Sequence, residues 1–132
     1  MQVIKTPLEG VLVIEPKVFK DSRGFFVETY NEERYMQAGI TARFVQDNMS
    51  ASTYGVVRGL HFQRPPYTQA KLVSCIEGEV LDVAVDLRKD SPTYGQWYSV
   101  LLSAENHRQF FIPRGFAHGF SVLTPEVVFQ YK

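Results

Sequence analysis

The segment VVRGLHFQRPP, residues 56–66, contains a histidine of the kind that does acid–base chemistry. Histidine is the side chain whose unperturbed pKa lies near neutrality, so His61 is suited to act as a general base. The valines favour a β-strand. That strand should end near Arg64, because Pro65 and Pro66 cannot donate hydrogen bonds to a ladder.

The same segment places an arginine before the histidine. In a regular strand Arg58 and His61 would point to opposite faces of the sheet. A β-bulge at Gly59 would shift this alternation and bring both side chains to one site. Taken alone, the segment favours a core histidine and a solvated arginine over such a shared site.

A second histidine, His118, lies in the segment FIPRGFAHGFS. Pro113 and Gly115 interrupt a strand and Gly119 follows, so the backbone is expected to bend sharply next to the ring. The Pro-x-Gly-x-x-His pattern resembles the second motif of cupins, small β-barrels that hold a metal or a substrate inside. The third histidine, His107, follows polar residues in a turn and is expected to be solvated.

The first motif of a metal-binding cupin supplies His-x-His, but the corresponding residues here are His61, Phe62 and Gln63. A glutamine amide is a poor replacement for an imidazole at a transition-metal site. Two histidines without a third strong ligand hold a catalytic metal badly. We therefore expect a barrel that binds no metal.

An acid–base site is the alternative use of His61. Lys71 begins the next strand, and pairing of adjacent strands would place its ammonium near the imidazole. Asp82 and Asp86 share the face of their strand that is opposite the apolar residues, and a carboxylate pointing into the barrel would pair with Lys71 or orient a histidine. The hydroxyl of Tyr131 would also reach the interior.

Composition limits the class of protein. The chain has 132 residues, of which 45% are hydrophobic, enough for one domain whose core needs no metal or disulfide. Fourteen basic residues balance fourteen acidic ones, which argues against a nucleic-acid partner. Cys75 is the only cysteine, so an intrachain disulfide is excluded. No apolar run approaches the ~18 residues of a membrane span, and the first residues, MQVIKTPLEG, contain no apolar signal region, so we expect a cytoplasmic protein without membrane association.

The elements that must position these side chains are mostly strands. Short β-type runs separated by turn signals occur at residues 10–19, 25–30, 42–52, 56–64, 71–76, 79–88, 96–103, 109–113, 118–124 and 127–132.

The connections complete this prediction. Glu77 and Gly78 predict a tight hairpin turn between two of these runs. One helix is expected within residues 31–39, with Asn31 as its N-cap and Gly39 at its end. Many short strands and one helix predict a single all-β domain over residues 1–132, a cupin-like jelly-roll β-barrel. Because the last strand is followed by no turn or cap, we expect this domain to lack a C-terminal segment.

Five segments closely resemble the dTDP-4-dehydrorhamnose 3,5-epimerase family. They are DSRGFFVETYN, FVQDNMSAS, GVVRGLHFQ, QAKLVSCIEGEVLDVAVDLRKDSPTYGQW and FFIPRGFAHGFSVL, in order along nearly the whole chain. The resemblance implies a cupin-like homodimer that uses no metal or organic cofactor. It also implies inversion of carbons 3 and 5 of dTDP-4-dehydro-6-deoxy-D-glucose to give dTDP-4-dehydro-L-rhamnose, a step of dTDP-L-rhamnose biosynthesis.

The resemblance also implies roles for individual residues. His61 is the base, Tyr131 is the acid, Lys71 lies near the 4-keto oxygen and His118 is a second histidine of the pocket. The residues implied to bind the nucleotide are Arg23, Glu28, Gln46, Asp47, Asn48 and Arg58, with Phe26 flanking the base or sugar.

Two features of the family bear on what this chain can do. The segment that carries Arg23 and Glu28 reaches the nucleotide site of the neighbouring subunit, and an aspartate that pairs with the base histidine lies beyond residue 132. Two alternatives to the 3,5-epimerase stay open: an epimerase that inverts only one carbon of a related dTDP-4-keto sugar, and a barrel that binds a nucleotide sugar without turning it over.

Overall fold

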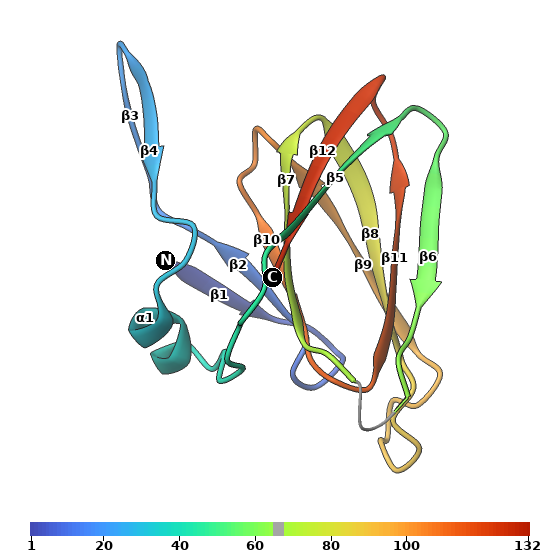
Figure 1. Ribbon diagram of the computed structural model, residues 1–132. Helices are drawn as coiled ribbons and strands as arrows, with labels where there is room; N and C mark the ends of the chain where they lie inside the picture. The colour runs from blue at the N-terminus through green and yellow to red at the C-terminus, as the bar shows by residue number, and fades with distance from the viewer. Residues whose placement is uncertain (65–67) are drawn as a thin grey trace.

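The computed structural model describes residues 1–64 and 68–132, which form two facing antiparallel sheets, a projecting hairpin and one short helix (Figure 1). The predicted strand stop at Pro65 and Pro66 lies outside the described residues. The elements are β1 Gln2–Lys5, β2 Leu12–Glu15, β3 Val18–Asp21, β4 Gly24–Val27, α1 Glu32–Gln37, β5 Asn48–Thr53, β6 Val57–His61, β7 Lys71–Glu77, β8 Glu79–Asp86, β9 Trp97–Ser103, β10 Gln109–Ile112, β11 Phe116–Val122 and β12 Glu126–Tyr131.

The two sheets give the jelly-roll barrel that the sequence predicts. One sheet has six strands in the order β1-β2-β10-β7-β12-β5, and the other has four in the order β6-β11-β8-β9. The main core, which includes Val80, Phe110 and Phe129, fills the space between them. Because strand side chains alternate, Asp82 and Asp86 of β8 lie on one face of the strand, as predicted, but this is the buried face, and the apolar Leu81, Val83 and Val85 lie on the less buried one.

The six-stranded sheet is also covered on its outer face. Leu12, Leu72 and Phe111 alternate with residues of the barrel core and pack against Tyr35 and Ile40 from α1 and the turn after it. The helix begins and ends as predicted. The Asn31 side chain accepts a hydrogen bond from a backbone N–H of the first turn at 3.0 Å, and Gly39 follows the last turn with φ +100°.

The predicted hairpin at Gly78 is wrong. β7 pairs with β10 and β12 of one sheet, whereas β8 pairs with β9 and β11 of the other, so the chain changes sheets at this turn. Gly78 has φ +82°, and a Cβ there would lie 2.2 Å from the carbonyl oxygen of Glu126. Glycine is therefore needed here because the backbone turns tightly where the chain passes from one sheet to the other. A short sequence pattern does not distinguish such a turn from a hairpin.

Several strand assignments also differ from the prediction. The run 10–19 is divided at Pro16 into β2, which joins the six-stranded sheet, and β3, which pairs only with β4. Within the run 42–52, residues 42–47 have no regular structure and β5 begins at Asn48. The edge strand β1 was missed because its four residues lack a clear alternation.

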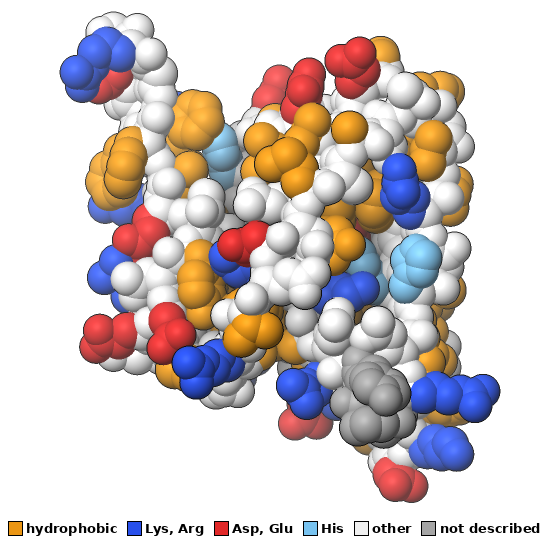
Figure 2. Space-filling model, in the orientation of Figure 1, with side chains coloured by type: hydrophobic (Ala, Val, Ile, Leu, Met, Phe, Trp, Pro, Cys, Tyr) orange, Lys and Arg blue, Asp and Glu red, His pale blue; other side chains and the backbone are white. Residues whose placement is uncertain are grey.

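β3 and β4 form an arm that projects away from the barrel (Figure 1). Hydrophobic side chains lie along it and charged ones at its tip (Figure 2). Phe19, Phe25 and Phe26 of the arm are 54%, 60% and 69% exposed, so its apolar surface is not buried by the described residues of this chain. Within the part of the chain that the structure describes, no helix is long and apolar enough to span a membrane.

Candidate active site

The strand that carries His61 contains a bulge at Gly59, the alternative that the segment taken alone does not favour. Between the cross-strand pairs His61–His118 and Arg58–Phe120, two residues of β6 lie opposite one residue of β11. The bulge begins at Gly59, where φ is +114° and a Cβ would lie 2.6 Å from a backbone atom of β11. Because cross-strand partners point to the same face of a sheet, the bulge turns both Arg58 and His61 toward the inner face.

An open cavity of about 410 Å³ lies between the two sheets, and residues from both of them line it. His61 comes from β6, Lys71 from β7 and Tyr131 from β12. The expected pairing of adjacent strands does not occur, because β6 and β7 belong to different sheets. Lys71 and His61 instead meet at the same cavity from the two facing sheets.

The ammonium of Lys71 is held at the base of β7. The residue is half-buried, and its Nζ lies 5.6 Å from the centre of the Tyr131 ring. Burial lowers the pKa of Lys71 below its ordinary value, and the negative charge of Asp82 opposes this effect. The cavity therefore contains an imidazole, a phenol and an ammonium in one small volume, which is a set suited to proton transfer next to a carbonyl group.

The second histidine is paired with a buried carboxylate. His118 Nε2 lies 2.8 Å and 2.9 Å from the two carboxylate oxygens of Asp82, and both side chains are buried. Burial raises the pKa of Asp82 above its ordinary value, although His118 and Lys71 both act to lower it. The expected pairing of a barrel carboxylate with a histidine is confirmed for Asp82, and the partner is His118 rather than His61.

The second buried carboxylate of β8, Asp86, has a structural role. Asp86 accepts hydrogen bonds from Arg88, Ser91 and Thr93 at 2.5 to 3.0 Å, and these contacts hold the pKa of Asp86 well below its usual range. The guanidinium of Arg88 in turn lies 4.6 Å over the ring of Phe116, which lines the cavity. Asp86 therefore supports the cavity wall without facing the cavity.

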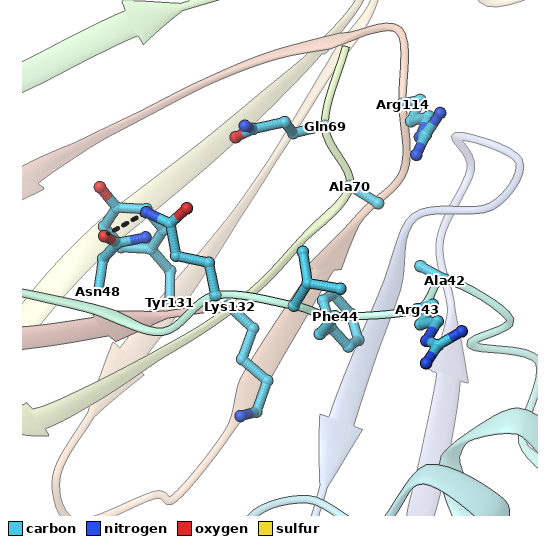
Figure 3. Close-up of a pocket in the computed structure, with 11 residues that line it drawn as sticks. Ala42, Arg43, Phe44, Asn48, Gln69, Ala70, Arg114, Tyr131 and Lys132 are labelled. Carbon is cyan, nitrogen blue, oxygen red and sulfur yellow. Dashed lines mark hydrogen bonds between the residues drawn. The ribbon is translucent and has the colours of Figure 1, made fainter. Parts of the chain in front are cut away.

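The segment before β5 supplies polar groups at the mouth of the cavity. Gln46 and Asn48 line it and are joined to each other by a 3.0 Å hydrogen bond. Figure 3 shows a smaller adjoining pocket of about 130 Å³, with Asn48 and Tyr131 at one end and Arg43 and Arg114 at the other. Asp47, between the two amides, is instead paired with Lys132 at 2.6 Å.

The remaining predicted nucleotide residues lie apart from the cavity within this chain. Arg58 spans the edges of the two sheets and donates a 2.9 Å hydrogen bond to Ser52 Oγ on β5. On the arm, Arg23 pairs with Asp21, and Glu28 just beyond the arm pairs with Arg34 of α1. The structure therefore brings the acid–base residues together but leaves the arm residues elsewhere.

Two other expectations concern the metal and His107. Gln63 lines the cavity beside His61, and the described residues contain no group of three His, Cys, Asp or Glu side chains placed to hold a metal ion. His107 is not a freely solvated loop residue, because its ring is half-buried and meets the edge of Phe25 on the arm, with centroids 4.7 Å apart.

The whole barrel matches one family of sugar epimerases. A family profile described as dTDP-4-dehydrorhamnose 3,5-epimerase matches residues 5–132. The dTDP-4-dehydrorhamnose 3,5-epimerase of Shigella flexneri is 60% identical over 133 aligned residues, which cover 100% of this chain and 74% of that protein.

Solved structures agree with this match. The dTDP-6-deoxy-D-glucose-3,5-epimerase of Legionella pneumophila Philadelphia 1, crystallised with dTDP-4-keto-L-rhamnose, is 55% identical with a TM-score of 0.95 over 99% of this chain and 70% of that one. The Bacillus anthracis dTDP-4-dehydrorhamnose 3,5-epimerase, with TDP and PPi bound, is 50% identical with a TM-score of 0.97 over 99% and 75%. The chain therefore belongs to the dTDP-4-dehydrorhamnose 3,5-epimerase family.

Proposed function

We propose that this protein epimerises dTDP-4-dehydro-6-deoxy-D-glucose at carbons 3 and 5, giving dTDP-4-dehydro-L-rhamnose for dTDP-L-rhamnose biosynthesis. The observation that carries the proposal is the meeting of His61, Lys71 and Tyr131 at one cavity of about 410 Å³, in a barrel of the epimerase family. Both reacting carbons flank the 4-keto group, so a base and a stabilised oxyanion are the chemistry that the reaction needs.

His61 is the proposed base. It removes the proton from one of the two carbons, and the bonding electrons move onto the 4-keto oxygen as an enolate. Lys71 faces His61 from the opposite sheet, where its ammonium would stabilise that oxyanion. One preorganised donor of this kind is commonly worth about 2.7–4 kcal/mol of barrier.

Tyr131 is the proposed acid. Inversion requires that the new proton arrive on the face of the sugar opposite the base, and Tyr131 lies on β12 of the six-stranded sheet while His61 lies on β6 of the other. A base on one sheet and an acid on the other suit a sugar ring held between them. Groups acting in this way each contribute roughly 10²–10⁴-fold to the rate.

The nucleotide would lie toward the mouth of the cavity. Gln46 and Asn48 offer amide groups there. Arg58 does not line the cavity but lies on β6, the strand of His61, and its guanidinium has fixed donors that suit a diphosphate. Arg58 donates to a neutral serine, so a phosphate is able to replace this partner without breaking an ion pair. Asp47 is proposed to act nearby by holding Lys132.

A homodimer would give the arm a function. Its exposed phenylalanines, together with Arg23 and Glu28, lie away from the cavity of their own chain. We propose that they reach the nucleotide site of a second copy, with Phe26 against the base or sugar. Light scattering with and without Phe26→Ala tests this, and a monomeric wild-type protein that binds dTDP normally would refute it. A cytoplasmic location stays a prediction.

The direct test is turnover of dTDP-4-dehydro-6-deoxy-D-glucose in deuterium oxide, with the product analysed by proton NMR. Deuterium at both carbon 3 and carbon 5 is expected. Deuterium at only one carbon would identify a single-carbon epimerase. Binding of dTDP without any exchange would instead identify a non-catalytic binding barrel.

A further inference from the structure

One buried carboxylate of the barrel, Asp82, has fewer hydrogen-bond partners than a buried charge needs. Asp82 is fully buried on the inner face of β8, opposite the apolar Val100 of β9. His118 Nε2 lies close to both of its oxygens, but the one N–H is aligned with Oδ2, so Oδ1 has no hydrogen-bond partner among the described residues. A buried carboxylate in this state is costly unless further positive charge lies near it.

That further charge is Lys71 of the proposed site. The negative charge of Asp82 raises the pKa of Lys71 against the effect of burial, and the charge of Lys71 lowers the pKa of Asp82. The ammonium and the carboxylate come from facing sheets, β7 and β8, so the coupling crosses the barrel interior. Lys71 is therefore linked to a group that does not line the cavity.

Aromatic packing holds the cluster in place. The His118 ring stacks on Phe129 with centroids 6.2 Å apart and an interplanar angle of 19°. Phe129 lies next to Tyr131, and Lys71 Nζ is over the Tyr131 ring.

Five strands bring ionisable groups to this region. They are His61 from β6, Lys71 from β7, Asp82 from β8, His118 from β11 and Tyr131 from β12. Asp82 is the one carboxylate of this set, so its negative charge is the one within the set that offsets the ammonium of Lys71.

We propose that Asp82 is a positioning residue, whose buried carboxylate orients the His118 ring and keeps the ammonium of Lys71 charged beside the 4-keto oxygen of the substrate. That the charge of Lys71 matters for catalysis rests on the proposed function. The ionisation of Lys71 is a property of the free protein and is measurable without substrate.

The experiment is an NMR titration of the lysine side chains, with Lys71→Arg used to assign the Lys71 signal. Asp82→Asn removes the charge at nearly constant shape. Glu79→Gln is the matched control, because it removes one carboxylate from the half-buried first residue of the same strand. Asp82→Asn is expected to lower the pKa of Lys71 by about one unit, the small end of the effect of a nearby opposite charge. The control is expected to leave it unchanged. A Lys71 titration that is the same in Asp82→Asn and wild type would overturn the proposal.

The rate gives a second readout. Because the reaction needs the ammonium, the alkaline limb of kcat is expected to move to lower pH by the same amount in Asp82→Asn, with KM changed less than twofold. An alkaline limb of kcat at the same pH in Asp82→Asn and wild type would contradict the proposal. Should wild type prove inactive on the sugar while the Lys71 titration shifts as expected, the proposed function fails and the role of Asp82 stands.

A measurement on wild type alone covers the case in which Asp82→Asn does not fold. The ¹⁵N shifts of the His118 ring are expected to show a proton on Nε2 at neutral pH, donated to a charged Asp82. An unprotonated Nε2 would mean that Asp82 is itself the donor and is neutral. A neutral Asp82 cannot support the charge of Lys71, so this result would overturn the proposal.

Discussion

Replacing Gly59 by alanine tests how the bulge positions His61. A φ of +114° costs an L-residue about 1–2 kcal/mol. The new Cβ would also lie 2.6 Å from Gly119 Cα and 2.7 Å from the His118 carbonyl oxygen, which are backbone atoms that cannot turn aside. We expect a total loss of about 3 kcal/mol in the free energy of unfolding, or displacement of β6 from β11.

Gly55→Ala is the matched control, four residues earlier in the chain. Its φ is +86°, but no atom lies within 4 Å of the added Cβ, so it carries the conformational cost without the clash. Urea unfolding and initial rates of epimerisation are measured for both variants. Because a misplacement of about 1 Å can cost about 10²-fold in rate, Gly59→Ala should lose activity well beyond Gly55→Ala. Equal stability and equal rates in the two variants would refute this account of the bulge.

Three further predictions follow from the site and its support. The pKa of Asp86 is depressed in the folded state, so the stability that Asp86 contributes is present above pH ~4 and is lost as the pH falls below it. Asp86→Asn should therefore lower the free energy of unfolding by about 3 kcal/mol at pH 7. In urea unfolding, the free energy of the variant should depend less on pH in the acid range. Tyr131→Phe should keep part of the hydrogen exchange at the first carbon while inversion falls by roughly 10²-fold or more, as followed by NMR in deuterium oxide; equal losses would argue against Tyr131 as the acid. Turnover should survive EDTA, because Gln63 stands where a metal site needs a histidine; stoichiometric metal with activity lost on chelation would contradict this.

Residue patterns predicted the features that depend on local rules. Gly59 allows a bulge that brings Arg58 and His61 to one face, which the segment offered as an alternative, and the N-cap at Asn31 followed from its hydrogen-bonding side chain. That Asp82 and Asp86 share one face of β8 followed from strict alternation, although the apolar pattern of residues 81, 83 and 85 does not indicate that this face is the buried one. The N-cap contact lies within three residues of Asn31, and alternation is a property of the strand itself.

Features that depend on distant packing were not predictable in this way. Gly78 marks a change of sheet only because residues near Glu126, almost fifty positions later, crowd that corner. The pairing of Asp82 with His118 joins residues 36 positions apart, and nothing near either one indicates which histidine the carboxylate contacts. The roles given to His61 and Tyr131 came from resemblance to a family, and their geometry now makes them testable.

The central claim is that His61 removes the proton that starts the reaction, and exchange in deuterium oxide measures this step alone. Wild type and His61→Ala are incubated with dTDP-4-dehydro-6-deoxy-D-glucose, and deuterium at carbons 3 and 5 is counted by mass spectrometry. We predict two deuterium atoms per product molecule for wild type. For His61→Ala, with unfolding and dTDP affinity unchanged, we predict none above the uncatalysed background. Exchange at the wild-type rate in His61→Ala would contradict the account.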